Sequence, residues 1–223
     1  MRIGIIGTGM MAAALGGAWV DASHEVLIGG RDPAKAAAVA GRIGAAGHGT
    51  LADAARFGDA VLVAVPAGEA VAVTAGLAGQ LAGRAVVDCT NPLAPTGDGL
   101  MVTAPIARRL ADAAPAARVV KAFNLCHESI WTLRPPVYEG QSLVVPFCTD
   151  DPGAAAMVDD LITSIGCTPA HCGGLARATY LEATAALAIG MWFAGAQPRW
   201  AFPAPAEVQA AEVQAAEVQA AEV

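Results

Sequence analysis

Apolar residues along this chain occur in short runs that alternate with segments of helical spacing. Runs typical of buried strands cover residues 2–6, 25–28, 59–65, 84–91 and 118–124, with a weaker one near 48–50. Between them, apolar side chains such as Met11, Leu15 and Trp19 recur on one face of a helix, and further helices are predicted at 34–43, 69–81 and 106–113. Buried strands alternating with helices are typical of a parallel, doubly wound α/β sheet.

The pattern continues more irregularly after residue 124. It predicts strands at 142–148 and 168–172 and helices at 152–165 and 180–193. We interpret residues 1–124 as one domain and residues 125–203 as a small C-terminal α/β lobe that covers the sheet.

From residue 204 onward the chain is a repeat of Ala-Glu-Val-Gln-Ala with a period of five. Each repeat turns about 140° around an ideal helix, so no single face stays apolar. We predict that residues 204–223 form a low-complexity tail that is disordered or a frayed, exposed helix.

The first predicted strand leads directly into a Gly-x-Gly-x-x-Ala turn, residues 7–12. Gly7 permits a sharp turn, Gly9 lets the backbone approach a pyrophosphate, and Ala12 allows close packing of helix on strand. The helix that follows presents unpaired amides and the positive end of its dipole to an anion. The turn and its context predict a bound dinucleotide and a Rossmann-type sheet.

The end of the second strand indicates which dinucleotide is bound. An acid at that place accepts hydrogen bonds from the ribose of NAD and repels an added phosphate. This chain has Gly30 there, and Arg31 and Lys35 offer positive charge to a 2′-phosphate, so NADP is preferred. The alternative is that Arg31 and Lys35 are solvated charges around the start of a helix that Asp32 caps. An Asp32 side chain turned toward the ribose would favour NAD.

Loops after the later strands add polar candidates. They are Val65-Pro66 and the segment 66–68, Asn91 in the segment 90–93, and Asn124. Open α/β sheets bind ligands at the carboxyl ends of their strands, so these residues are candidates for contact with the cofactor. Ordinary turn chemistry is the alternative for the Pro, Gly and Asn positions.

Composition excludes several classes of function. The 223 residues are 55% hydrophobic, enough for one domain or a domain with a lobe. A net charge of -7 without a basic cluster argues against nucleic acid or an anionic membrane as partner. The first strand begins at once, leaving no room for a signal peptide, and the longest apolar stretch, 183–196, is shorter than a membrane span. We expect a cytoplasmic protein.

Five cysteines stand at positions 89, 126, 148, 167 and 172 without a Cys-x-x-Cys pair, which indicates reduced thiols in the core. A metal site would have to use Cys126, His127, Cys167, His171 and Cys172. Consecutive residues of a strand point to opposite faces, so His171 and Cys172 would not converge. We therefore expect no metal.

Acid and base residues for catalysis are scarce. Neither Tyr138 nor Tyr180 has a lysine four residues later. The candidates for the catalytic centre are Asn124, Cys126 and His127, which follow the strand 118–124. An enzyme with no obvious acid or base is intelligible if hydride passes between two redox rings, because alignment then supplies much of the rate enhancement.

Seven segments, in this order, carry a family resemblance: GTGMMAAALGGAW, HEVLIGGRDPAKA, AVPAGEA, DCTNPL, VVKAFN, CTDDPGAA and GGLARATYLEA. Together they cover the chain to about residue 200 and resemble the NADPH-dependent coenzyme F-420 (F420) reductase family, to which the cytosolic domains of membrane ferric reductases are also similar. The resemblance implies an NADP-dependent oxidoreductase that passes hydride between NADP(H) and F420 or another flavin-like ring. Asn124, Leu125 and Cys126 would line the cleft.

The resemblance also implies roles for individual residues. Thr8, Arg31 and Lys35 would hold the 2′-phosphate. The pyrophosphate turn would consist of Gly7, Gly9, Met10 and Met11, with Val65, Pro66 and Asn91 near the cofactor.

Three positions depart from the family pattern. A serine that precedes the arginine in the family is Gly30 here. In a Gly-Pro-Leu-x-x-Ala-Arg-x-Leu-Glu element, the proline is Gly174 and the arginine is Thr179. Because these last two lie in the lobe that would meet the second substrate, the acceptor stays open.

Two other functions are compatible with the sequence. One is an NADPH-dependent reductase of a small imine or carbonyl, with His127 as proton donor; the other is a non-catalytic NADP-binding sensor. The expected partners are a small redox molecule and, because the 180–193 helix is apolar, a second copy in a homodimer. The sequence does not fix the acceptor, the direction of hydride transfer or the role of the terminal repeat.

Overall fold

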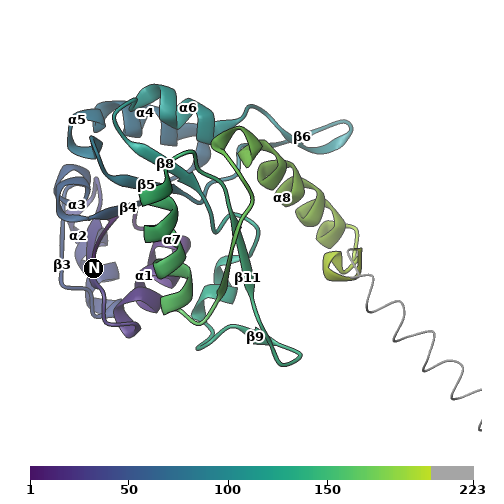
Figure 1. The fold of residues 1–223 in the computed structure, drawn as a ribbon, viewed down its shortest axis with the longest axis horizontal. Helices are drawn as coiled ribbons and strands as arrows, with labels where there is room; N and C mark the ends of the chain where they lie inside the picture. The colour runs from purple at the N-terminus through teal and green to yellow at the C-terminus, as the bar shows by residue number, and fades with distance from the viewer. Residues whose placement is uncertain (202–223) are drawn as a thin grey trace, which may run out of the picture. The chain divides into compact units, whose positions relative to one another are not determined.

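The computed structural model describes residues 1–201 and has an α/β fold (Figure 1). Residues 1–186 form one compact unit, and the chain from residue 187 onward belongs to a second. The tail expected at residues 204–223 lies outside the described residues. The domain boundaries expected after residues 124 and 203 stay predictions.

Six parallel strands form the central sheet in the order β3-β2-β1-β4-β5-β8. They are β1 (Arg2–Ile6), β2 (Glu25–Gly29), β3 (Gly47–Gly49), β4 (Ala60–Val63), β5 (Ala85–Asp88) and β8 (Arg118–Lys121). The order runs outward in both directions from the neighbours β1 and β4, which are paired in parallel from Ile3 with Ala60 to Ile6 with Val63. The doubly wound parallel sheet predicted from the hydrophobic pattern is confirmed.

Helices cover both faces of the sheet (Figure 1). One layer contains α1 (Met10–Asp21), α2 (Pro33–Ile43) and α7 (Pro152–Ser164), and the other contains α3 (Leu51–Phe57), α4 (Ala67–Gly76), α5 (Ala78–Leu81) and α6 (Ile106–Ala113). Alternation along β1 sends Ile5 to the first layer and Ile6 to the second. Trp19 on α1 donates its indole N–H to the carbonyl of Leu161 on α7 at 3.3 Å, which joins two helices far apart in sequence.

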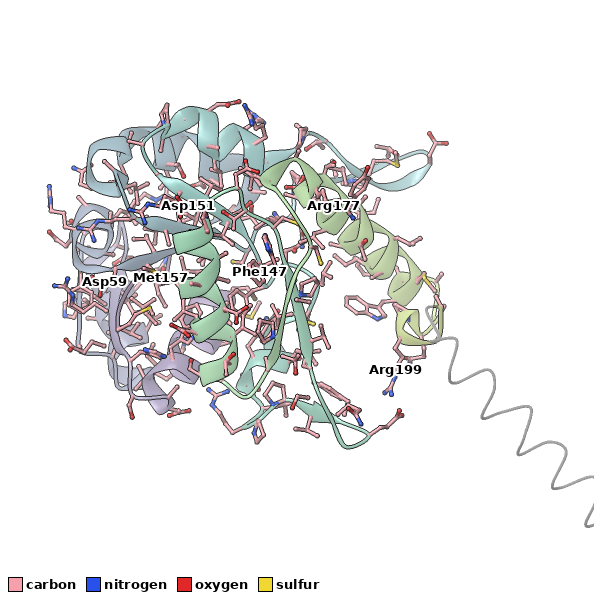
Figure 2. All side chains as sticks on the ribbon, viewed as in Figure 1. Asp59, Phe147, Asp151, Met157, Arg177 and Arg199 are labelled. Atoms are coloured by element: carbon pink, nitrogen blue, oxygen red, sulfur yellow. The ribbon has the colours of Figure 1, made fainter. Side chains whose placement is uncertain are left out.

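Two helices begin at the same local signal, an Asp followed by a Pro. Asp32 accepts from the backbone amides of Ala34 and Lys35 at 3.0 and 3.2 Å, and Asp151 accepts from that of Ala154 at 2.7 Å. Figure 2 shows Asp151 at the start of α7 and Met157 further along the same helix, where Met157 is half-buried against the core. Such caps stabilise a helix by about 1 kcal/mol each, so the sequence itself determines where α2 and α7 begin.

The segment after the sheet contains smaller elements. They are η1 (Glu128–Thr132), β9 (Val137–Tyr138), β10 (Gln141–Ser142), β11 (Val144–Phe147), β12 (Thr168–His171), η2 (Leu175–Arg177), α8 (Ala178–Phe193) and η3 (Pro198–Ala201). β11 and β12 pair in parallel, and the buried Phe147 stacks on His171 with ring centroids 5.0 Å apart (Figure 2). A bridge from Lys121 to Cys148 joins this pair to the end of β8. Along the described chain, no helix has the length and apolarity needed to cross a membrane.

Several features differ from the sequence prediction, among them the strand expected at 142–148, which is divided into β10 and β11. The helix expected at 69–81 is divided into α4 and α5 at Leu77, in a stretch where Gly76 and Gly79 lower the helix propensity. An antiparallel hairpin of β6 (Leu93–Thr96) and β7 (Gly99–Val102) was not predicted, because its proline and glycines resemble a loop.

A buried group of charges lies at the carboxyl ends of β5 and β8. The ammonium of Lys121 is 2.9 Å from Oδ2 of Asp88 and 3.3 Å from Oε1 of Glu182, and all three side chains are fully buried. Glu182 also accepts from the amides of Ile106 and Ala107 at the start of α6, at 3.3 and 3.2 Å. Two carboxylates are thus balanced by one ammonium and by the positive end of a helix.

We predict that Lys121→Ala lowers the free energy of unfolding by about 3–5 kcal/mol, because it leaves two carboxylates buried without their cation. Denaturant titration followed by circular dichroism measures the change. The exposed Arg109 on α6 provides the control, since its replacement by Ala should change stability by no more than about 0.5 kcal/mol. Equal denaturation midpoints for the two variants would contradict the expectation.

Candidate cofactor and substrate site

The predicted site residues follow the carboxyl ends of neighbouring strands. Residues 7–11 follow β1, Arg31 follows β2, Val65 and Pro66 follow β4, Asn91 follows β5 and Asn124 follows β8. Because all these strands are parallel, their carboxyl ends lie at one edge of the sheet. The fold therefore brings the predicted cofactor loops to the same edge.

The glycine turn after β1 has the geometry of an anion cradle. Gly7 has a φ of 132°, and a Cβ there would collide with the carbonyl of Ala64 beside it, so only glycine fits. Gly9 is the N-cap of α1 and makes no side-chain capping bond. The space where its Cβ would lie is open to 4 Å. The first amides of α1 are thus accessible to a phosphate group, and the turn fits a dinucleotide.

The two methionines of the turn have different environments. Met10, the first residue of α1, is 70% exposed, whereas Met11 is half-buried against the core on the α1 side of the sheet. After β4, Val65 is half-buried against the core of the opposite face, and the exposed Pro66 is the N-cap of α4.

Both basic residues of the predicted 2′-phosphate site are paired with acids. Nη2 of Arg31 lies 2.9 Å from Oε2 of Glu69 in the first turn of α4. Nζ of Lys35 lies 3.9 Å from Oδ2 of Asp32. Asp32 is the N-cap of α2, so the cap that the sequence allowed is present.

A side chain at Gly30 would be crowded in this structure. A Cβ at Gly30 would lie 2.8 Å from Cγ2 of Thr8 and 3.2 Å from Cβ of Ala36. The methyl group of Thr8 therefore occupies the space that a serine side chain would need. Thr8 and Gly30 form a complementary pair at the end of β2.

Two asparagines connect the ends of β5 and β8. Nδ2 of Asn91 donates to the backbone carbonyl of Asn124 at 2.7 Å, and Nδ2 of Asn124 donates to Oδ1 of Asn91 at 2.9 Å and to the carbonyl of Leu181 at 3.1 Å. Oδ1 of Asn124 is buried and has no hydrogen-bond partner among residues 1–201. The preceding Phe123 has a φ of 61°, a conformation that costs free energy and often accompanies functional sites. The structure thus leaves a buried acceptor at the sheet edge.

The other two candidates for the catalytic centre follow Asn124 directly. Cys126 is half-buried against the core, and burial raises the pKa of its thiol to about 11. The thiol is therefore protonated at neutral pH and is a weak nucleophile. His127 is exposed, with Nδ1 3.0 Å from Oγ of Ser129 and Nε2 3.1 Å from Glu128. Both ring nitrogens of His127 thus contact residues of its own turn.

The five residues considered for a metal site do not form one in the structure. Within residues 1–201, no group of three or more His, Cys, Asp and Glu side chains is arranged to hold a metal ion. His171 instead stacks on Phe147, and its Nε2 lies 3.4 Å from the carbonyl of Thr149.

Sequence reasoning missed two charged features at this edge. Glu69 lies in the first turn of α4, directly after the segment 66–68 that the sequence did single out, so its position near the cofactor edge was available as a signal. The only signal for the buried group was Lys121 itself, a lysine inside an apolar strand. Its partner Glu182 is 61 residues later, and their contact requires the folded arrangement.

Comparison with known proteins shows where these features recur. Residues 2–92 match the model of the coenzyme F420-dependent NADP oxidoreductases. This segment of the chain is therefore similar to that family. The matched residues include the glycine turn, Arg31, Lys35, Glu69 and Asn91.

Similar proteins extend the likeness beyond residue 92. The chain is 30% identical over 191 residues to metalloreductase STEAP3 of Rattus norvegicus, a match that covers 86% of this chain and 38% of that protein. The chain thus spans well under half of this relative. A protein of Arthrobacter sp. FB24 proposed to be an F420-dependent NADP reductase is 27% identical, with a TM-score of 0.78 and coverage of 89% and 96% of the two chains. The predicted resemblance to both groups is confirmed.

An imine reductase of Streptomyces aurantiacus has the same fold. It is 18% identical, with a TM-score of 0.64, and the match covers 99% of this chain and 77% of that one. At this identity the likeness concerns the fold alone.

We predict that Gly30→Ser lowers the free energy of unfolding by about 1–3 kcal/mol, because the new side chain meets the methyl group of Thr8. Thr8→Ser removes only that methyl group. The double variant Thr8→Ser/Gly30→Ser should therefore regain most of the lost stability, measured by thermal and denaturant unfolding. Additive losses in the double variant would contradict the steric explanation.

Proposed function

We propose that this protein is an NADP-dependent oxidoreductase that moves hydride between NADP(H) and a flavin-like ring of the F420 class. The observation that carries the proposal is the accessible N-terminus of α1 at the glycine turn, within a segment that matches a family of NADP oxidoreductases. An uncapped helix start next to Arg31 suits a dinucleotide with an added phosphate.

The roles of the cofactor residues follow from their places at the sheet edge. The turn of Gly7, Gly9, Met10 and Met11 would hold the pyrophosphate on the first amides of α1. Thr8, Arg31 and Lys35 would hold the 2′-phosphate by a hydroxyl and two cations. Val65, Pro66 and Asn91 would lie beside the cofactor as it extends across the ends of β4 and β5.

The reacting end of the site would lie near Asn124. When bound, the nicotinamide supplies or accepts the hydride, and the protein contributes alignment and exclusion of water. Oδ1 of Asn124 is a buried acceptor without a partner among residues 1–201, so a carboxamide N–H would reach it only if the surrounding side chains move. The thiol of Cys126, whose pKa is about 11, would contribute an apolar wall.

One observation favours a second candidate function. Nε2 of His127 lies 3.1 Å from the carboxylate of Glu128, a contact that holds the imidazole ring in place at the exposed end of this segment. With His127 as proton donor, the protein would reduce a small imine or carbonyl with NADPH. If NADPH binds and no acceptor is reduced, the protein would instead be a non-catalytic NADP sensor.

We further propose that the protein acts in the cytoplasm on a small-molecule redox partner and forms a homodimer. Leu187, Trp192 and Phe193 of α8 are exposed apolar side chains that support self-association. Sedimentation equilibrium of the full chain distinguishes a dimer from a monomer.

Turnover is tested with purified protein, NADPH and oxidised F420, by following the absorbance of both ring systems. We expect NADPH to be consumed together with F420. A small cyclic imine serves as the competing acceptor. Tight NADPH binding without reduction of any deazaflavin or flavin would contradict the proposed acceptor, and reduction of the imine that is lost in His127→Ala would favour the second candidate.

The role of Arg31 is tested by its replacement with alanine. We expect Arg31→Ala to weaken NADPH binding about tenfold or more, the loss of a charge-assisted hydrogen bond to phosphate. NADH lacks the 2′-phosphate, so its affinity should change little. Fluorescence titration of both cofactors measures the two dissociation constants, and equal losses would refute the assigned contact.

A further inference from the structure

The predicted 2′-phosphate site is close to electrically neutral in the protein alone. Its two cations, Arg31 and Lys35, are matched by the carboxylates of Glu69 and Asp32 at 2.9 and 3.9 Å. Asp32 also accepts hydrogen bonds from two backbone amides at the start of α2. Glu69 differs, because it reaches Arg31 from α4, a separate element that follows β4.

We propose that Glu69 sets the selectivity of this site between NADP and NAD by competing with the 2′-phosphate for Arg31. The inference rests on the proposed function and concerns the same site. An acid that determines cofactor choice usually lies at the end of the second strand. In this chain Gly30 stands at that end. Glu69 instead brings a carboxylate to Arg31 from α4.

The physical basis is the donor and the charge that Glu69 takes from Arg31. Glu69 contacts Nη2 of the guanidinium, so a 2′-phosphate that approaches this nitrogen meets a donor already in use and a cation already paired with an anion. A 2′-phosphate near Arg31 also places a second anion close to Glu69, and the two repel. Binding of NADP must therefore either separate Glu69 from Arg31 or leave Glu69 as a second anion beside the 2′-phosphate. NAD meets no such repulsion, because its 2′-hydroxyl donates to a carboxylate.

The exposure of the pair sets the size of the effect. The side chain of Arg31 is 73% exposed and that of Glu69 is 42% exposed, so water weakens their attraction and the pair separates at modest cost. Glu69 accordingly adjusts the affinity for NADP without excluding it.

A merely structural role for Glu69 makes a different prediction. As an acid in the first turn of α4, Glu69 stabilises that helix through the dipole. Its replacement would then change stability and leave the ratio of the two cofactor affinities unchanged. The ratio of affinities is therefore the decisive measurement.

The test uses the full chain and fluorescence titration with NADPH and NADH. In Glu69→Gln we expect NADPH affinity to rise about two- to fivefold, the range for an exposed ion pair, and NADH affinity to stay level or fall. Glu25→Gln is the matched control, because it removes the same charge from an exposed glutamate at the opposite end of β2. It should leave the ratio of affinities unchanged.

A double variant tests the competition directly. In an Arg31→Ala background, Glu69→Gln should no longer raise the NADPH affinity by more than a small factor, because there is no guanidinium to compete for. High salt should shrink the effect of Glu69→Gln in the otherwise unchanged protein.

The outcomes separate this inference from the proposed function. If the unaltered protein binds NADPH and Arg31→Ala weakens it, while Glu69→Gln leaves the ratio unchanged, the selectivity role is wrong and the NADP site stands. If Glu25→Gln raises NADPH affinity as much as Glu69→Gln, overall charge and not Glu69 is responsible. If the unaltered protein binds no NADPH, both proposals fail.

Discussion

One buried ammonium group holds together the elements that meet at the sheet edge beside Asn91 and Asn124. Lys121 ends β8, Asp88 ends β5, and Glu182 belongs to α8 while it also caps α6. The cost of burying these charges is offset only when all the partners are in place, so their relative geometry is strongly constrained. Asn91 and Asn124 lie next to this group and bond to each other and to Leu181. The position of the candidate substrate edge thus depends on an ionic contact within an otherwise apolar core.

Local signals made much of the fold predictable from the sequence. The glycine turn, the Asp-Pro helix starts and the apolar strands each act over a few residues, and the structure places β1, α2 and α7 within one or two residues of the expected bounds. The hairpin of β6 and β7 escaped prediction because its turn-forming residues lie inside the strands. The division at Leu77 escaped because Gly76 and Gly79 lower the helix propensity without fixing the residue at which a helix ends.

The candidate site was predictable only in part, for a related reason. A parallel sheet brings strand ends to one edge, so the loops that carry Arg31, Pro66, Asn91 and Asn124 followed from the strand pattern alone. The partner of each side chain did not follow. The Arg31–Glu69 pair depends on how α4 leaves β4, which no local pattern encodes. For His127, the sequence located the residue but not the contacts with Ser129 and Glu128 that its ring makes.

The close fit of Thr8 and Gly30 has a consequence for how this cofactor loop evolves. A side chain at position 30 and the methyl group at position 8 compete for the same space, so the two positions are not independent. A lineage that acquires serine at position 30 while threonine remains at position 8 passes through a strained intermediate, whereas loss of the methyl group first opens an unstrained route. Substitutions at these two positions are therefore best made together, because the stability of one replacement depends on the side chain present at the other.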